Sequence, residues 1–479
     1  MGRSTVWIRR TGIAVVALMA FPLADVAGQE QPHRDALGNI DFALTGDAII
    51  TRKLSVYQEQ EFLEIRDLIR NATAAFTNAE VLFLDYDEPD VIPSSSSGGT
   101  YMRAEPEMAE ELTWMGIDMV SLANNHTMDY GVGGLRAHMK WVEAAGLVAA
   151  GAGERLAEAR APGYLETPGG RVALISISSS FNDLGRAGPQ RRDLRGRPGL
   201  SPMRYQTIYT VPGDRFETLV GLVDDLGLRG TQEGNEIRLF GETFKRGNAH
   251  SVTTRVDQAD MAELAAEIRD AKRQANWVIV TSHSHEGGAS RDVPADFVEE
   301  FARASIDAGA DMWVGHGPHV LRGIEIYNGK PIFYSLGDFI MQNETVELQP
   351  ADNYASYGLG NDDSPADFYD TRIAASPTGS FPGSSVFWEA VVAIPAFKDG
   401  HLAEIRLHPI TLGHGLPRPQ RGRPLAAKGE LAGKIIADLQ RLSEPYGTNI
   451  VFENGIGVIR VTLTSTTENN HSGADLRHQ

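Results

Sequence analysis

The sequence contains no cysteine. This absence excludes disulfide frameworks, thiolate nucleophiles, iron–sulfur clusters and cysteine-ligated zinc. Any metal ion must therefore be held by histidine, aspartate, glutamate or asparagine. Positive charge is also scarce, because 44 lysines and arginines stand against 63 acidic residues and leave a net charge of -19. Such a surface would repel a nucleic-acid backbone, so DNA and RNA are excluded as general partners.

Long apolar runs are absent except near the N-terminus, where Arg3, Arg9 and Arg10 precede the run Gly12–Leu23. This order is typical of a secretory signal peptide and predicts cleavage after residues 1–28, which places the mature protein in the periplasm or outside the cell. The run is shorter than the roughly 20 residues of a spanning helix, so an uncleaved membrane anchor is the alternative. The paired arginines leave Sec and twin-arginine export both open.

Strand-length apolar runs alternate with helical patterns through the rest of the chain, which predicts a layered α/β domain over residues 38–463. Helices are expected at 58–75, 106–115, 257–275 and 294–308, and strands at 40–45, 81–84, 118–122, 171–177, 277–281, 311–314, 386–394, 402–407 and 456–463. Asn328-Gly329 between two further runs, 324–327 and 331–334, indicates a β-hairpin.

Two stretches interrupt this alternation. Residues 181–250 hold a group of arginines among glycines and prolines, against the acidic composition of the chain. Residues 341–383 are rich in Asp, Ser, Gly and Pro and are predicted to form a long surface loop or lid. The polar residues 464–479 are expected to be a disordered tail.

Polar side chains gather where the predicted strands end, which is where open α/β sheets build their sites. They are Gly46-Asp47, Asn78-Ala79-Glu80, Asn124-Asn125-His126, His283-Ser284-His285-Glu286 and Gly315-His316-Gly317-Pro318-His319. This donor set suits one or two divalent ions of Mn, Fe, Zn or Mg. Taken singly, each element could have a purely structural role, because an aspartate at a strand end is often a helix cap and paired asparagines often form a turn. The recurrence of five such elements at the same kind of position favours a metal site.

Two of these segments resemble a known family. Ser121-Leu122-Ala123-Asn124-Asn125-His126 with Asp129-Tyr130-Gly131 resembles a motif of the CapA family, associated with poly-γ-glutamate capsule synthesis. The run from Val314-Gly315-His316 through Ser335-Leu336-Gly337 resembles a second motif of that family. The resemblance extends from about Ile40 to Phe339. Through it the chain is similar to calcineurin-like metallophosphoesterases, which implies a four-layer α/β/β/α sandwich with a two-metal centre.

The resemblance also implies roles for individual residues. Metal ligands would be Asp47, Glu80, Asn125, His283, His316 and His319. His126 would protonate the leaving group, with Asn124 beside it in the catalytic group. Apart from the resemblance, substrate is expected to be bound by Asn78, His285, Arg197 and Arg204. The two arginines are positive charges in an acidic chain, and they flank a Pro-Gly turn in a segment that resembles the family.

Two departures from the metallophosphoesterase pattern stand out. Ile49 occupies the position of a metal-binding histidine, so one metal position lacks a ligand there. Ser284 and His285 follow His283 where the CapA family has a tryptophan and a glycine, and His285 is a candidate for the missing ligand.

These features predict a secreted or periplasmic, metal-dependent hydrolase acting on poly-γ-glutamate or another cell-envelope polymer. Its ligand would be an anionic polymer or a small anion, with envelope assembly proteins as further partners and no transmembrane span after cleavage. Two alternatives stay open: a non-enzymatic factor that binds and exports a capsule polymer, and a phosphoesterase acting on nucleotides or phospho-sugars.

Overall fold

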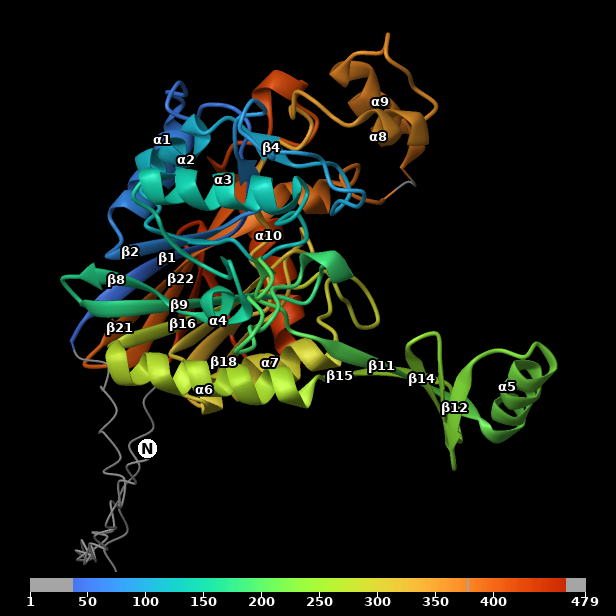
Figure 1. The fold of residues 1–479 in the computed structure, drawn as a ribbon. Helices are drawn as coiled ribbons and strands as arrows, with labels where there is room; N and C mark the ends of the chain where they lie inside the picture. The colour runs from blue at the N-terminus through green and yellow to red at the C-terminus, as the bar shows by residue number, and fades with distance from the viewer. Residues whose placement is uncertain (1–37, 377–378, 462–479) are drawn as a thin grey trace, which may run out of the picture. The chain divides into compact units, whose positions relative to one another are not determined.

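The computed structural model describes residues 38–376 and 379–461. The expected signal peptide (1–28) and the expected tail (464–479) lie outside these residues. Two β-sheets face each other, and helices cover the outer face of each sheet (Figure 1). The four-layer α/β/β/α arrangement predicted from the sequence is therefore confirmed.

In the first sheet, β2, β5 and β6 follow β1 on one side and are parallel to it. On the other side of β1, the antiparallel strand β21 pairs with its first part and the parallel strand β20 with its end. The parallel strands are β20 (Asp338–Met341), β1 (Ile40–Ile49), β2 (Ala74–Ala79), β5 (Met119–Ser121) and β6 (Val148–Ala150). The antiparallel strands are β21 (Glu389–Lys398), β22 (His401–Thr411), β23 (Leu425–Ala426), β25 (Ile456–Arg460) and β24 (Val451–Glu453).

The second sheet has β16 (Trp277–His283) at its centre, parallel to both of its neighbours, β9 (Gly170–Ser178) and β17 (Met312–His316). Beyond them lie β8 (Gly163–Thr167), β19 (Lys330–Phe333) and β18 (Ile324–Tyr327). The hairpin predicted at Asn328-Gly329 joins β18 to β19, and both turn residues have the positive φ that this two-residue turn requires.

Successive side chains along the strands point to opposite faces of each sheet, which gives one core between the sheets and one between each sheet and its outer helices. On β1, Phe42 and Leu44 point into the core between the sheets, whereas Ala43 points to the helices outside. Burying each large apolar side chain there stabilises the fold by about 1.5–3 kcal/mol. The outer layers are α1 (Gln60–Arg70), α2 (Glu107–Met115) and α3 (Gly131–Ala144) on the first sheet, and α6 (Gln258–Gln274) and α7 (Asp296–Asp307) on the second. Helix α10 (Gly429–Ser443) packs into the core between the sheets.

The stretches that interrupt the alternation are partly folded. Within and just after the first, β11 (Tyr205–Pro212), α5 (Gly213–Asp225), β12 (Gly230–Glu233), β13 (Glu236–Leu239), β14 (Glu242–Gly247) and β15 (Ser251–Val256) form a five-stranded sheet with one helix. Phe216 and Ile237 belong to a small core of its own, so we call residues 205–256 the small module. The second stretch contains α8 (Ala351–Ser356) and α9 (Pro365–Ala375), and Phe368 is buried in the core under the first sheet's helices.

One prediction near the site is wrong. The pattern predicts a helix over 58–75 and a strand over 81–84, but α1 ends at Arg70 and the sheet strand is β2, Ala74–Ala79. Alanines favour helix locally, yet here small side chains fit a strand buried on both faces, and tertiary packing overrides propensity. Within 81–84 only Leu82–Phe83 is strand, as β3, and it pairs with β4 (Arg103–Ala104) in a sheet of its own.

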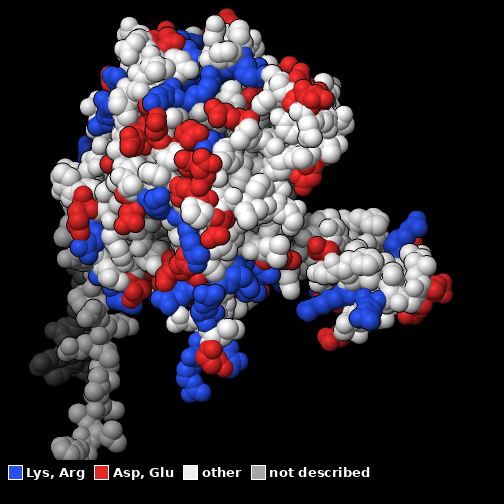
Figure 2. Space-filling model, turned by 45° about the horizontal axis from the view of Figure 1, so that its top comes forward, with Lys and Arg blue, Asp and Glu red and all other residues white. Residues whose placement is uncertain are grey.

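The remaining short elements are β7 (Ala152–Gly153), α4 (Leu156–Arg160) and β10 (Gly199–Leu200). On the face drawn in Figure 2, acidic and basic side chains are interspersed. Attraction of an anion to this face must therefore rest on particular arginines rather than on a broad basic surface.

Candidate metal centre

Five strand ends bring the predicted ligands together. In the first sheet Asp47 is in register with Asn78 on β2 and with Asp338 on β20. In the second sheet His283 on β16 is in register with His316 on β17. Parallel strands end at the same edge of a sheet, so Asp47, Asn78, His283 and His316 gather at one end of the sandwich. Asp338 joins them from the first position of β20.

The close approach of two strands depends on a glycine. A Cβ added to Gly46 would lie 1.7 Å from the carbonyl oxygen of Gly337, so no other residue fits between β1 and the start of β20. This contact sets Asp338 beside Asp47. The resulting group of Asp47, Glu80, His319 and Asp338 is fully buried, and each residue offers a ligand atom within 4.8 Å of those of the others.

A second group shares Asp47. His283 Nδ1 and His316 Nδ1 lie 3.6 and 3.5 Å from Asp47 Oδ1, and the two ring nitrogens lie 3.0 Å apart. Gly317 N donates to Asp47 Oδ2 at 2.8 Å and Asn78 Nδ2 donates to Oδ1 at 2.8 Å, which fixes the carboxylate. Asp47 therefore stands between two potential ion positions.

Several oxygens in this region lack the partners that buried polar groups normally have. Both carboxylate oxygens of Glu80, Oδ2 of Asp338 and Oδ1 of Asn125 are buried without a hydrogen-bond donor. An unpaired buried oxygen costs about 1–3 kcal/mol, and more when it is charged, unless a cation satisfies it. The residues present thus fit one or two divalent ions, whose identity they leave open.

The electrostatics point the same way. Burial, followed by the charges of Asp47 and Asp338, raises the pKa of Glu80 well above its ordinary value. Burial also raises the pKa of Asp338 to about 6, although His319 partly opposes the shift. For Asp47, hydrogen bonds from His283 and His316 outweigh burial and hold its pKa well below the usual range. Three carboxylates this close need positive charge before all of them ionise.

Two of the histidines, His283 and His285, are held in the form that binds metal, whereas the charges of Asp338 and Asp47 outweigh burial and raise the pKa of His319 above its ordinary value. Burial lowers the pKa of His283 to about 4 against the opposing effect of Asp47, and burial also lowers the pKa of His285 well below its usual value. Both imidazoles are therefore neutral near pH 7, as metal ligation requires. His285 Nε2 lies 3.0 Å from His283 Nε2, and the two form a third potential ligand group with Glu80.

Asp338 is a member of the cluster that was not predicted from the sequence. Ile49 is at the end of β1 and lines the cavity beside the cluster, so its position offers no ligand. The neighbouring strand β20 adds the Asp338 carboxylate next to Asp47, with His319 Nδ1 2.8 Å from Asp338 Oδ1. In the sequence, Asp338 could have been recognised only by its position directly after Gly337, which follows an apolar run.

His126 lies next to the metal ligands in a separate hydrogen-bond pair. Its Nδ1 is 2.7 Å from Asp129 Oδ2, and Asp129 in turn accepts from the backbone N–H groups of Gly98 and Met102. A carboxylate on Nδ1 keeps the proton there and leaves Nε2 for the cavity that His126 lines. Asp129 is thus a positioning residue that the sequence argument did not assign.

Two of the asparagines, Asn78 and Asn124, form hydrogen bonds that support the site, and a third, Asn125, lines the cavity. Asn124 Nδ2 donates to Ala79 O at 2.9 Å and to Asn78 Oδ1 at 3.3 Å, and its own Oδ1 accepts from His126 N. Asn124 and Asn78 therefore fix the backbone around the site. Asn125 donates to Gly98 O at 3.0 Å and lines the cavity.

A cavity of about 150 Å³ opens beside the cluster, and we call it the metal-side cavity. Its lining includes Glu80, His126, His285 and His319 together with Arg291 and Arg372. Phe381 covers one side, because its ring stacks on His319 with the centroids 4.5 Å apart.

The structure places the predicted substrate arginines elsewhere. Arg204 forms a two-bond ion pair with Asp260, at 2.7 and 2.9 Å, and Arg197 Nε donates to Arg186 O. Neither lines the metal-side cavity. Arg291 and Arg372 line it instead, and no ion pair joins either of them to a carboxylate of the residues described.

Comparison with known families agrees with this arrangement. Residues 41–343 match the family described as bacterial capsule synthesis protein PGA_cap. The chain belongs to this family. The match covers Asp47, Glu80, all of the histidines of the cluster and Asp338. The resemblance to CapA stated from the motifs is therefore confirmed.

Curated relatives of this PGA_cap protein fall into two groups. Two uncharacterized proteins of Sinorhizobium fredii, y4sH and y4uA, are each 37% identical over 428 residues, which cover 87% of this chain and 92% of theirs. The PGA biosynthesis protein CapA of Bacillus subtilis is 28% identical over 241 residues, covering 50% of this chain and 47% of its own. A probable polyglutamine synthesis accessory protein of Mycobacterium tuberculosis is 30% identical over 245 residues, covering 51% of this chain and 50% of its own.

Solved structures similar to the PGA_cap chain include a hypothetical protein from Thermus thermophilus, with a TM-score of 0.33, 12% identity and coverage of 77% of this chain and 98% of that one. Another is an NAD nucleotidase from Haemophilus influenzae, with a TM-score of 0.31, 10% identity and coverage of 84% and 62%. Within residues 38–376 and 379–461, the helices are too short or too polar to cross a bilayer.

Proposed function

We propose that this PGA_cap protein is a metal-dependent hydrolase of the periplasm or the cell exterior that acts in the metabolism of poly-γ-glutamate or another anionic envelope polymer. The observation that carries the proposal is the buried Asp47–Glu80–His319–Asp338 group, whose unpaired oxygens lie beside a cavity that also contains His126.

The residues divide the work between two ion positions. Glu80, His319 and Asp338 would hold one ion, His283 and His316 the other, and Asp47 lies between them. Asn125 and His285 line the cavity next to these positions. Bound there, the ions supply an activated water and polarise the scissile group.

His126 is the proposed general acid. For this role His126 would carry a second proton, on Nε2, while Asp129 accepts from Nδ1–H. As the water oxygen adds to the scissile centre, the bond to the leaving atom would break, that atom would take the Nε2 proton, and the proton lost by the water would restore the one on His126. Asp129 holds the opposite nitrogen and stabilises the ring in the right orientation. Arg291 and Arg372 would hold an anionic group of the substrate, because guanidinium groups pair with carboxylates and phosphates.

The central prediction concerns His316. His316→Ala should lose most of its bound metal and its hydrolytic activity while the protein stays folded, because an imidazole ligand between Asp47 and Thr281 is removed. Metal content would be measured by elemental analysis of the mature protein, and folding by circular dichroism. The matched control is His401→Ala, which removes an exposed histidine. Unchanged metal content in His316→Ala would contradict the assignment.

A hydrolysis screen then tests the reaction. The metal-loaded protein should cleave poly-γ-glutamate, releasing shorter chains detectable by size-exclusion chromatography, and His316→Ala should not. Metal-loaded protein that binds the polymer without cleaving it would instead indicate a binding or export factor. Cleavage of phosphate esters alone would indicate the phosphoesterase alternative.

A further inference from the structure

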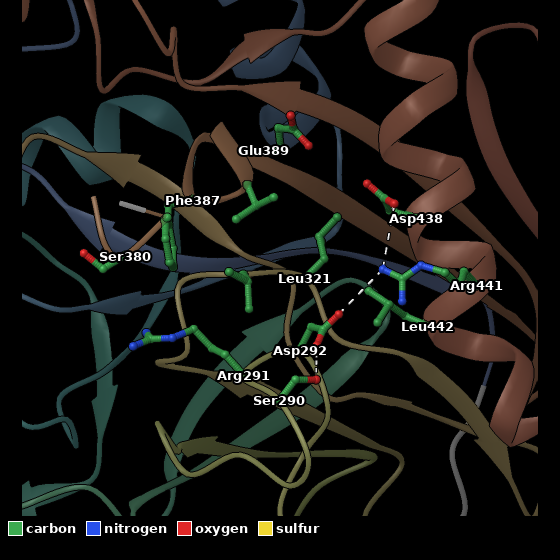
Figure 3. A pocket seen from close by; sticks show the side chains of 13 residues that line it. Ser290, Arg291, Asp292, Leu321, Ser380, Phe387, Glu389, Asp438, Arg441 and Leu442 are labelled. Carbon is green, nitrogen blue, oxygen red and sulfur yellow. Dashed lines mark hydrogen bonds and ion pairs between the residues drawn. The ribbon is translucent and has the colours of Figure 1, made fainter. Parts of the chain in front are cut away.

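A larger cavity adjoins the metal-side cavity. It has a volume of about 560 Å³ and is lined by residues of the loop after β16, the start of β21 and helix α10 (Figure 3). We call it the neighbouring cavity. The metal-side cavity, at about 150 Å³, is smaller than the roughly 300–1,000 Å³ of typical small-molecule sites, whereas the neighbouring cavity falls within that range. A substrate larger than its reacting group therefore needs more space than the metal side offers.

Arg291 connects the two cavities, because it lines both. Its guanidinium lies 5.5 Å from the ring centre of Phe387, a wall of the neighbouring cavity, and Phe387 packs edge-on against Phe381 on the metal side. Buried Arg322 donates to the carbonyl oxygens of Arg291 and Glu286, at 2.9 Å each, and so fixes this loop. In Figure 3 the guanidinium of Arg291 points away from Arg441 and toward Phe387 and Ser380.

Apart from Arg291, the charged groups that line the neighbouring cavity are already paired. Arg441 lies 3.6 Å from Asp292 and 3.8 Å from Asp438, and Glu389 pairs with Lys434. They leave no charge of one sign to attract a second anion. Between them the wall is apolar: Leu321, Phe387 and Leu442 show less than a tenth of their surface, and Val386 is 41% exposed.

We propose that the neighbouring cavity binds an uncharged, apolar portion of a ligand whose anionic group is held by Arg291. The proposal deepens the proposed function and rests on it, since it names a substrate class for the same site: an anionic unit that carries an acyl-like group. Carboxylates of further units of a polymer would have to point away from this wall, because a charge against Leu321 and Val386 costs desolvation free energy without a partner.

The test uses N-acyl-L-glutamates with acyl chains of two to eight carbons as probes, titrated calorimetrically into the full mature protein loaded with metal. Affinity should rise about two- to fourfold for each added methylene until the cavity is filled. In Val386→Asp this rise should disappear, because a charge now lies on the apolar wall. The matched control Val56→Asp, an exposed valine in a turn away from both cavities, should keep it. Arg291→Gln should weaken every probe by roughly tenfold or more.

Equal affinity across the series, or an unchanged rise in Val386→Asp, would overturn the inference. The titrations measure binding without hydrolysis. If affinity depends on acyl-chain length but the protein cleaves no substrate, this inference stands and the catalytic proposal is wrong. If the protein cleaves substrate but affinity does not depend on acyl-chain length, the catalytic proposal stands and this inference is wrong.

Discussion

The two ring nitrogens of His126 have different surroundings. Nδ1 faces the buried carboxylate of Asp129, and the ring lines the metal-side cavity. His126 is absent from the three groups whose ligand atoms could share an ion, although it comes directly after Asn125. Its role is therefore separable from metal binding.

His126→Asn should keep its metal and lose rate by about a hundredfold or more on substrates with poor leaving groups, since protonation is then unassisted. On an ester with a good leaving group the loss should be much smaller. The measurement is kcat on a pair of esters that differ in leaving-group pKa, with metal content determined in parallel. Equal losses on both esters would assign His126 to positioning instead of acid catalysis.

Glu80 destabilises the folded protein when metal is absent and stabilises it when metal is bound. Its oxygens lack donors, and burial with the nearby Asp47 and Asp338 charges raises its pKa. Glu80→Gln should leave the melting temperature of the metal-free protein unchanged or higher at pH 8. Bound metal at a hundredfold excess over Kd should raise the free energy of unfolding of the wild type by about 2.7 kcal/mol, and this stabilisation should be largely lost in the variant. Thermal melts with and without added Mn or Zn measure both, and a variant that keeps the full rise would exclude Glu80 as a ligand.

Among the elements, the small module over residues 205–256 is separable from the site. It has its own core around Phe216 and Ile237, and β11 pairs with β15 in a regular antiparallel ladder that includes Thr207 opposite Thr254. None of its residues lines the metal-side cavity. Its connection to the sandwich includes Tyr205, whose ring stacks on Phe297 of α7 with centroids 4.3 Å apart.

Replacing residues 208–253 by Asn-Gly should therefore give a folded protein with normal metal content. The ladder up to Thr207 and Thr254 is retained, and Asn-Gly forms the two-residue turn that antiparallel strands need. Elemental analysis and thermal melting measure the outcome. Loss of metal would show that the module supports the site from a distance. Loss of activity on polymer, with activity on small esters retained, would be the readout of a role in binding long substrates.

At the scale of the whole molecule, buried histidines link stability to pH. Burial lowers the pKa of His138 to about 3, and Phe83 N donates to its Nδ1 at 3.0 Å, which requires a neutral ring. Burial lowers the pKa of His408 to about 4. A lowered folded pKa means that the unfolded chain binds more protons below pH 6.5, so the stability from these residues is complete above pH 6.5 and is lost as pH falls toward 3–4.

In the metal-free protein, the free energy of unfolding should therefore fall on acidification from pH 6.5 to 5 by up to about 1.4 kcal/mol per pH unit for each such histidine. The raised pKa values of Glu80 and Asp338 act in the opposite direction, so the comparison must be between variants. His138→Asn keeps an acceptor for Phe83 N and should give a flatter pH dependence in urea unfolding. The same slope in wild type and variant would contradict the account.

The sequence alone determined the chemistry available to this protein. Without cysteine, a metal centre had to use His, Asp, Glu or Asn, and Asp47, Glu80, His283, His316 and His319 were identifiable because each follows a strand-like run. The hairpin at Asn328-Gly329 was predictable for a local reason, since its turn residues favour positive φ. Local patterns such as these depend on neighbours in the chain.

Tertiary structure decided what depends on distant residues. The helix predicted over 58–75 runs into the start of β2, and the strand Ala74–Ala79 forms because it is buried between two neighbouring strands. Asp338 joins the site because Gly46 lets β1 approach Gly337 closely, which no spacing in the sequence reveals. The sequence shows that Arg204 carries a charge, but only the structure shows that it pairs with Asp260. Arg291 and Arg372 line the metal-side cavity instead. Contacts over long stretches of chain are set by packing, and therefore appear only when the sheets assemble.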